Sequence, residues 1–218
     1  MPDNETTTTQ TKGYFTGILD MYVAKMLTPD TSAAAPTYDT PRLLGMSIEV
    51  TITPQFKEGA LHASNKVVRS KKVIDRYDLS FNADVITPDV AAYIYDRKSD
   101  AKGVQILDGD NNPPECAIGF ARTKDNGEKE YWWLYRTKFS EPTVSGKTEA
   151  DAIEYQTPTI EARCDRRIYD NKLGMVADSE DANLDSSVLA TWFSAVYEAA
   201  AAASSGSGTS GSGTSGNG

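Results

Sequence analysis

Alternating apolar and polar positions recur along the chain and predict β-strands, because successive side chains of a strand point to opposite faces. In 45–54, GMSIEVTITP, apolar side chains occupy every second position from Met46 to Ile52. In 158–170, PTIEARCDRRIYD, the same period separates an apolar face from a charged face. The apolar face carries Ile160, Ala162, Cys164 and Ile168, and the charged face carries Glu161, Arg163, Asp165 and Arg167.

The stretch 130–139, EYWWLYRTKF, is a predicted strand whose aromatic residues do not keep to one face. Because side chains alternate along a strand, one face should carry Tyr131, Trp133, Tyr135 and Phe139. The other face should carry Trp132 and Leu134. Three interpretations remain open: a buried core strand, an aromatic binding platform, or a subunit that is incomplete without its neighbour. If the strand is buried in the core or belongs to an incomplete subunit, we expect Tyr131, Trp133, Tyr135 and Phe139 to fill the core of the subunit. Trp132 and Leu134 would then pack under the C-terminal helix or against an adjacent subunit.

Two segments have the features of helices. Thr87 is a suitable N-cap and Pro88 a suitable first residue, which predicts a short helix near 88–97. Near the end of the chain, apolar residues recur at the spacing of one helical stripe, which predicts a C-terminal helix near 186–199, capped by Asp185 or Ser186. The stripe consists of Leu189, Trp192, Phe193, Val196 and Tyr197.

The remaining segments complete a mainly β prediction. Residues 56–72 are charged and only patchily apolar, which indicates a long hairpin with an exposed tip. Residues 1–12 are rich in threonine and 204–218 consist of glycine, serine, threonine and one asparagine, so we expect a flexible arm and a flexible linker or tail. Between them, 13–203 should form one β domain with a β-sandwich or barrel-like fold.

Charge and composition narrow the function. The net charge is −9, and such a surface repels free nucleic acid, which argues against a DNA-binding protein but not against one that lets DNA slide past. The two cysteines, Cys116 and Cys164, lie on predicted strands and are expected to be buried apolar residues. No apolar run has the ~20 residues of a membrane span, and the N-terminus lacks the apolar region of a signal peptide. We therefore expect folding in the cytoplasm and no membrane association.

The sequence offers little to support catalysis. His62 is the single histidine, it has no cluster of metal-ligating residues near it in sequence, and a solvent-facing strand position is expected for it. Neither a glycine-rich phosphate loop nor a nucleophile elbow is present. The sequence thus predicts that the chain is not an enzyme and has no metal or cofactor.

Several stretches in order resemble one family. They are GYFTGILDMYVAKM, TYDTPRLLGMSIEVTITP, EGALHASN, DRYDLSFNADVITPDVAAYIYDRK, AIGFARTKDNGEKEYWWLYRTKFSEP, TPTIEARCDRRIYDNK and WFSAVYEA. Together they span about residues 12 to 199 and resemble the major tail proteins, or tail-tube proteins, of long non-contractile-tailed bacteriophages (siphophages).

The resemblance implies a structural protein of the virion tail. Its subunits would form homohexameric rings that stack into a tube, and double-stranded DNA would pass through the lumen during genome ejection without specific binding. Assembly would occur in the host bacterial cytoplasm, with tail terminator, distal tail and tape measure proteins as partners. The alternative is a virion surface or receptor- and carbohydrate-binding β-sandwich module, since exposed aromatic rings stack on sugars.

The resemblance also suggests candidate residues. Ring-to-ring contacts would involve the N-terminal arm and the long hairpin, with the candidates Tyr14, Phe15, Phe56, Lys57, His62, Arg69, Lys71 and Lys72. Candidate core or inter-subunit residues are Trp132, Leu134, Trp192, Phe193 and Tyr197. Glu161 and Asp165 are candidates for the lumen wall, with ordinary solvent exposure an equal alternative.

Overall fold

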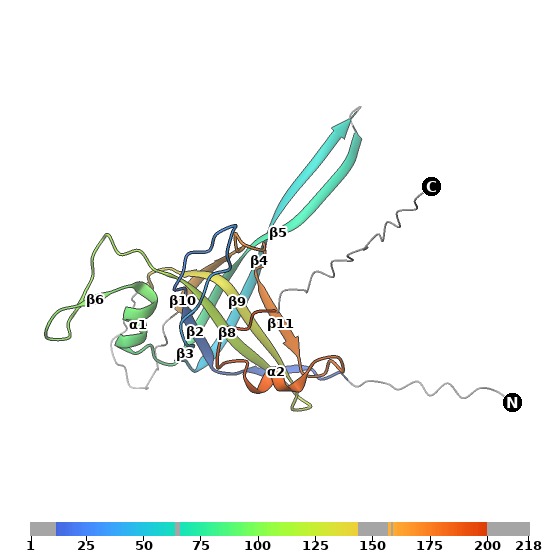
Figure 1. Ribbon diagram of the computed structural model, residues 1–218. Helices are drawn as coiled ribbons and strands as arrows, with labels where there is room; N and C mark the ends of the chain where they lie inside the picture. The colour runs from blue at the N-terminus through green and yellow to red at the C-terminus, as the bar shows by residue number, and fades with distance from the viewer. Residues whose placement is uncertain (1–11, 64–65, 144–156, 158, 200–218) are drawn as a thin grey trace, which may run out of the picture.

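The computed structural model describes residues 12–63, 66–143, 157 and 159–199 (Figure 1). The fold is mainly β, which confirms the predicted fold class. The strands are β1 (Phe15–Ile18), β2 (Met21–Lys25), β3 (Arg42–Gly45), β4 (Ser47–Ala63), β5 (Lys66–Ala83), β6 (Lys98–Ser99), β7 (Gln105–Ile106), β8 (Glu115–Lys124), β9 (Lys129–Phe139), β10 (Thr159–Asp165) and β11 (Gly174–Asp178). The helices are α1 (Pro88–Tyr95) and α2 (Ser186–Ala190).

Antiparallel pairing joins nine of these strands into one sheet. Its order is β3-β2-β8-β9-β10-β5-β4, with β1 also paired to β8 and β11 also paired to β9. The central β8–β9 hairpin turns at Asn126-Gly127, where Gly127 has a φ of 86°, a conformation that glycine adopts without strain. The sheet curls, so that β1 on one side approaches β4 at the far edge.

Two apolar cores lie on opposite faces of the central strands. The inner core, inside the curl, includes Phe81, Phe120 and Leu134, and α1 closes over it with Ile94 and Tyr95. The outer core is packed against residues of α2 and of the segment that follows it. Both faces of β9 are therefore covered by the subunit's own residues, which is why its aromatic side chains do not keep to one face.

A β-bulge changes the faces of β9. Ile118 pairs with Leu134, but two residues earlier on β8, Cys116 pairs with Thr137, so β9 has one extra residue in this interval. The prediction for Phe139 is therefore wrong: it lies in the inner core with Leu134, not with Tyr131, Trp133 and Tyr135. The alternation reverses because the extra residue shifts the register by one.

The helix predictions have different outcomes. Helix α1 has Thr87 as its N-cap and Pro88 in its first turn, as predicted. Helix α2 is capped by Asp185 but ends at Ala190, so the predicted helix near 186–199 is too long. Beyond α2 the chain turns, and its backbone hydrogen bonds join residues three positions apart, such as Trp192 N to Leu189 O at 3.3 Å. This tighter winding directs Trp192 into the outer core, where it is buried.

Strand β10 follows its predicted alternation as far as Asp165. Ile160, Ala162 and Cys164 are buried and alternate with exposed or half-buried neighbours. Past the strand end the chain turns, and the prediction is wrong for Arg167, which is buried, and for Ile168, which is exposed.

Strands β4 and β5 continue beyond the sheet as the predicted long hairpin, which projects from the body (Figure 1). We call its outer part, from the pair Phe56–Ile74 to the pair Ala63–Lys66, the distal ribbon. Residues 1–11 and 200–218 lie outside the described residues, so the predictions of a flexible arm and a flexible tail remain predictions.

Candidate assembly surfaces

Residues 191–199, which we call the C-terminal strap, cover the outer core. Trp133 Nε1 donates to Trp192 O at 3.0 Å, and Tyr135 OH donates to Tyr197 O at 2.6 Å. The rings of Phe193 and Tyr22 stack with centroids 4.5 Å apart. Backbone acceptors on the strap thus satisfy the two polar aromatic groups that β9 buries.

The predicted partners of the strap are therefore partly wrong. Trp192, Phe193 and Tyr197 pack on the face of β9 that carries Trp133, whereas Trp132 and Leu134 face the inner core. Trp133 is fully buried and Trp132 stacks on Phe120 with centroids 5.8 Å apart. The two adjacent indoles do not form an exposed aromatic platform.

A buried arginine fixes the strap to the body. The Arg167 guanidinium lies 4.0 Å from the ring centroid of Tyr135 and forms ion pairs with Asp170, at 2.5 Å, and with Glu198 of the strap. Burial opposes the charged form, but the two carboxylates outweigh it and raise the pKa of Arg167. The pKa of Asp170 is lowered, because its bonds to Arg167 and Lys172 outweigh its own desolvation. The sequence gives no sign of this site, because Arg167 follows the charged alternation of the strand before it.

The face of β10, β5 and β4 that points away from the inner core is polar. Glu161 is exposed, and Asp165, half-buried, pairs with Arg163 at 2.8 Å. On the adjacent β5, Arg76 pairs with Asp78 at 3.0 Å. Both lumen candidates thus lie on this polar face, where carboxylates and guanidinium groups pair along each strand.

Ion pairs join β4 and β5 at the base of the distal ribbon. Lys57 pairs with Asp75 at 2.7 Å, and Lys72 pairs with Glu58 at 2.6 Å while lying 4.5 Å from the ring centroid of Phe56. Among the other ribbon candidates, Lys71 is exposed, and the side chains of His62 and Arg69 lie outside the described residues.

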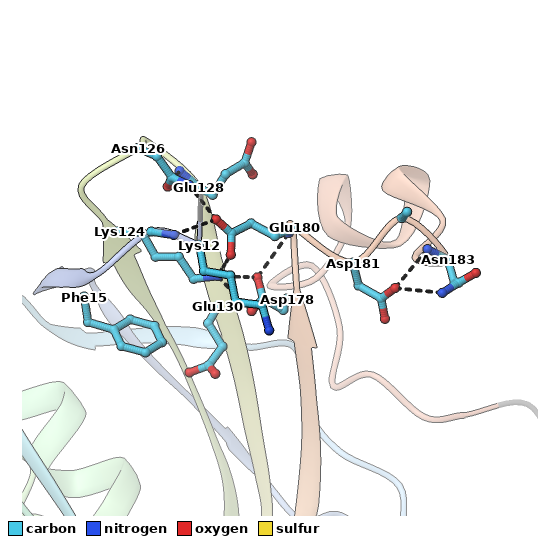
Figure 2. A pocket seen from close by; sticks show the side chains of 12 residues that line it. Lys12, Phe15, Lys124, Asn126, Glu128, Glu130, Asp178, Glu180, Asp181 and Asn183 are labelled. Carbon is cyan, nitrogen blue, oxygen red and sulfur yellow. Dashed lines mark hydrogen bonds and ion pairs between the residues drawn. The ribbon is translucent and has the colours of Figure 1, made fainter. Parts of the chain in front are cut away.

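The first described residues of the chain are held beside the β8–β9 turn (Figure 2). Glu180 accepts bonds from Gly13 N at 3.0 Å and from Lys124 Nζ at 2.5 Å, and Asn126 donates to it at 2.5 Å. The Lys124 bond, followed by the Gly13 and Asn126 bonds, lowers the pKa of Glu180 to about 2. This contact fixes Gly13 against the β8–β9 turn.

The same contact places the two N-terminal candidates on the surface. Tyr14 is largely exposed, and its backbone N–H donates to Asp125 at 2.8 Å. Phe15 is half-exposed, with the Arg122 guanidinium 3.6 Å from its ring centroid.

An apolar groove of about 540 Å³ lies between β1 and β4, where the curled sheet does not close. We call it the β1–β4 groove. It is lined mainly by Ile18, Ile48, Val50, Ile52, Phe120 and Trp132, with Arg122 among them. Ile48 is 56% exposed, although it lies on the face that alternation assigns to the core. Sequence reasoning missed the groove, because alternation does not show whether a curled sheet closes.

Both cysteines are buried, as predicted. Burial raises the pKa of Cys116 to about 12 and that of Cys164 to about 11, so both are thiols at neutral pH. In the part of the chain that the structure describes, no three metal-ligating side chains come together, and no helix has the length and apolar content to cross a membrane.

No protein-family model matches the chain, and no curated protein sequence matches it. Among the solved structures that are similar to this chain, two have a low TM-score and a low sequence identity to it. The crystal structure of Hcp1 from Salmonella typhimurium is 8% identical, with 75% of this chain and 94% of that chain covered and a TM-score of 0.30. A crystal structure of an Hcp protein is also 8% identical, with 73% and 99% covered and a TM-score of 0.30.

Proposed function

We propose that the chain is the structural subunit of a bacteriophage tail tube, in which hexameric rings stack around a lumen for double-stranded DNA. The distal ribbon carries this proposal. Its strands pair with each other beyond the body of the sheet, and an isolated two-stranded ribbon is only marginally stable in water. A ribbon of this kind is expected to pack on another copy, and head-to-tail contacts between copies generate rings and tubes.

The polar face suits a lumen that DNA must pass without sticking. Affinity for DNA comes mainly from Lys and Arg side chains that neutralise phosphates. On this face Arg163 and Arg76 are paired with carboxylates of their own strands, and the whole chain has a net charge of −9. We place Glu161 and Asp165 on the lumen wall for this reason.

We further propose that the chain acts without catalysis or cofactor, in the virion tail, after assembly in the host cytoplasm. Terminator, distal tail and tape measure proteins would be its partners at the tube ends and in the lumen. The raised pKa values of both thiols support a non-catalytic role, because a thiolate is the nucleophilic form of cysteine. A carbohydrate-binding module is less well supported, because Trp133 is buried.

Negative-stain electron microscopy of the concentrated protein tests the proposal. The expected result is sixfold rings and tubes built from them. Monomers alone, across a range of salt and crowding conditions, would count against a tube subunit.

A further inference from the structure

An apolar loop beside α1 is exposed on the surface. Val104, Ile106 and Leu107 are 62%, 49% and 75% exposed, and they are close together in sequence. We call residues 104–107, which include the short strand β7, the apolar loop. Single exposed aliphatic residues are ordinary, but three within four positions mark a surface suited to contact.

Hydrogen bonds hold this loop in one shape. Asp100 Oδ1 accepts from the backbone N–H groups of Lys102 and Val104 at 2.9 and 2.8 Å, and Asp100 N donates to Val104 O at 2.9 Å. The Gln105 side chain donates to Pro88 O, at the start of α1, at 2.5 Å. A loop that is already ordered loses little conformational freedom when it binds.

The β1–β4 groove offers a complementary surface. Its lining is aliphatic and aromatic, and β4 has β5 as its paired neighbour among the described residues, which leaves the edge beside the groove open. Ile48 and the apolar loop are all exposed, so the loop does not fill the groove of its own subunit. The match is apolar, because Arg122 in the groove wall already pairs with Glu130 at 2.6 Å.

We propose that the apolar loop of one copy occupies the β1–β4 groove of the next copy. This inference rests on the proposed tube subunit and names a contact within it. The contact is head-to-tail, because loop and groove are different surfaces of one chain, and such contacts close into rings when the rotation permits. Residues 1–11 and 200–218 are poor occupants, since apart from Met1 and Pro2 they have no apolar side chain larger than alanine.

Disulfide crosslinking between two singly substituted proteins tests the contact. Ile48→Cys and Leu107→Cys are purified separately, mixed under assembly conditions and mildly oxidised, and the same sample is imaged by negative stain. The native thiols should not interfere, because both are buried. We expect a crosslinked dimer from the mixture and not from either protein alone.

The outcomes separate this inference from the proposed function. Rings or tubes without the crosslink would overturn the loop contact and leave the tube subunit standing. A crosslinked dimer without rings or tubes would support the contact and count against the tube. If neither forms, both proposals fail. Ile153 belongs to a segment outside the described residues and is an alternative occupant of the groove. If Ile48→Cys forms a crosslink with Ile153→Cys and not with Leu107→Cys, the proposed contact is overturned.

A charge substitution gives a second measurement with a matched control. Leu107→Asp should raise the protein concentration needed for ring formation by about tenfold or more, the scale at which central interface residues act. Leu27→Asp changes another exposed leucine in the same way and should leave that concentration unchanged. An equal rise in both variants would show a general effect of charge and would overturn the assignment.

Discussion

Trp133 depends on two glycines that lie against it. A Cβ at Gly119 would lie 2.7 Å from the Trp133 ring, and a Cβ at Gly174 would lie 2.1 Å from the Trp133 carbonyl oxygen. The indole can occupy the outer core because Gly119 carries no side chain, and β11 can pair closely with β9 because Gly174 carries none. Backbone moves less readily than the end of a side chain, so position 174 is the more restrictive of the two.

Gly174→Ala should therefore destabilise the fold strongly. β9 and β11 would have to separate to admit the methyl group, at a cost of about 3 kcal/mol or more, the upper range for overpacking. Urea unfolding monitored by tryptophan fluorescence measures the change in the free energy of unfolding. Gly59→Ala is the control, because a Cβ there meets nothing within 4 Å. Equal stability of the two variants would contradict this account of the packing.

Glu180 should make stability depend on pH in acid. Its pKa is about 2 in the folded chain, mainly through Lys124, against ~4.3 for an unperturbed glutamate. A lowered pKa means that the contact stabilises the fold above pH ~4.3 and that this contribution is lost as the pH falls through about 2. The difference in unfolding free energy between the wild type and Glu180→Gln should therefore shrink from pH 5 to pH 2. A constant difference over that range would contradict the assignment.

Strands and caps could be predicted from sequence because their causes are local. The alternation in β4 and β10, the Thr87 cap of α1 and the Asn126-Gly127 turn all depend on neighbouring residues. The bulge in β9 could not be predicted, since it depends on how β8 and β9 pair. The end of α2 at Ala190 likewise depends on the outer core, which accepts Trp192 from a turn and not from a helix. The candidate surfaces were predictable only where consecutive segments of the chain form them, as β4 and β5 form the distal ribbon.

The strap should be essential to the fold, whereas residues after 203 should not be. A chain ending at Ala190 loses Trp192, Phe193 and Tyr197, and loss of one large aromatic side chain from a core already costs about 3–5 kcal/mol. It also leaves Arg167 without Glu198. We expect this variant to aggregate or unfold in size-exclusion chromatography and circular dichroism. A chain ending at Ala203 is the control and should remain folded and assemble; loss of its tubes would contradict the prediction for 204–218.

The distal ribbon should be dispensable for folding and required for stacking. Replacing 57–73 with Asn-Gly joins Phe56 to Ile74, which already face each other across the two strands, through a favoured two-residue turn. Because the removed residues pair with one another, the melting temperature should change little. Electron microscopy should then show no stacked tubes. Tubes of normal length would show that the ribbon does not join rings.

The whole molecule divides into a body whose central strands are covered on both faces and surfaces that are left exposed. Both faces of the central strands are covered by the chain itself, through α1 on one side and the strap on the other. The distal ribbon, the apolar loop and the β1–β4 groove remain exposed, and they come from different parts of the chain. Several separate contact surfaces on one subunit suit an assembly that grows in more than one direction.

The charge of the polar face should control how assembled tubes interact with DNA. Glu161 is exposed, so Glu161→Lys should not disturb the fold, and each ring would repeat the change in every subunit. If this face lines the lumen, the new cations should retain double-stranded DNA at low salt and release it as salt rises, because counterion release drives such binding. Co-sedimentation of tubes with short duplex DNA measures retention, and wild-type tubes should retain little. Asp181→Lys makes the same charge change in the exposed turn before α2, and its tubes should behave as the wild type. Equal retention by the two variants would show that Glu161 lies on the outside of the tube.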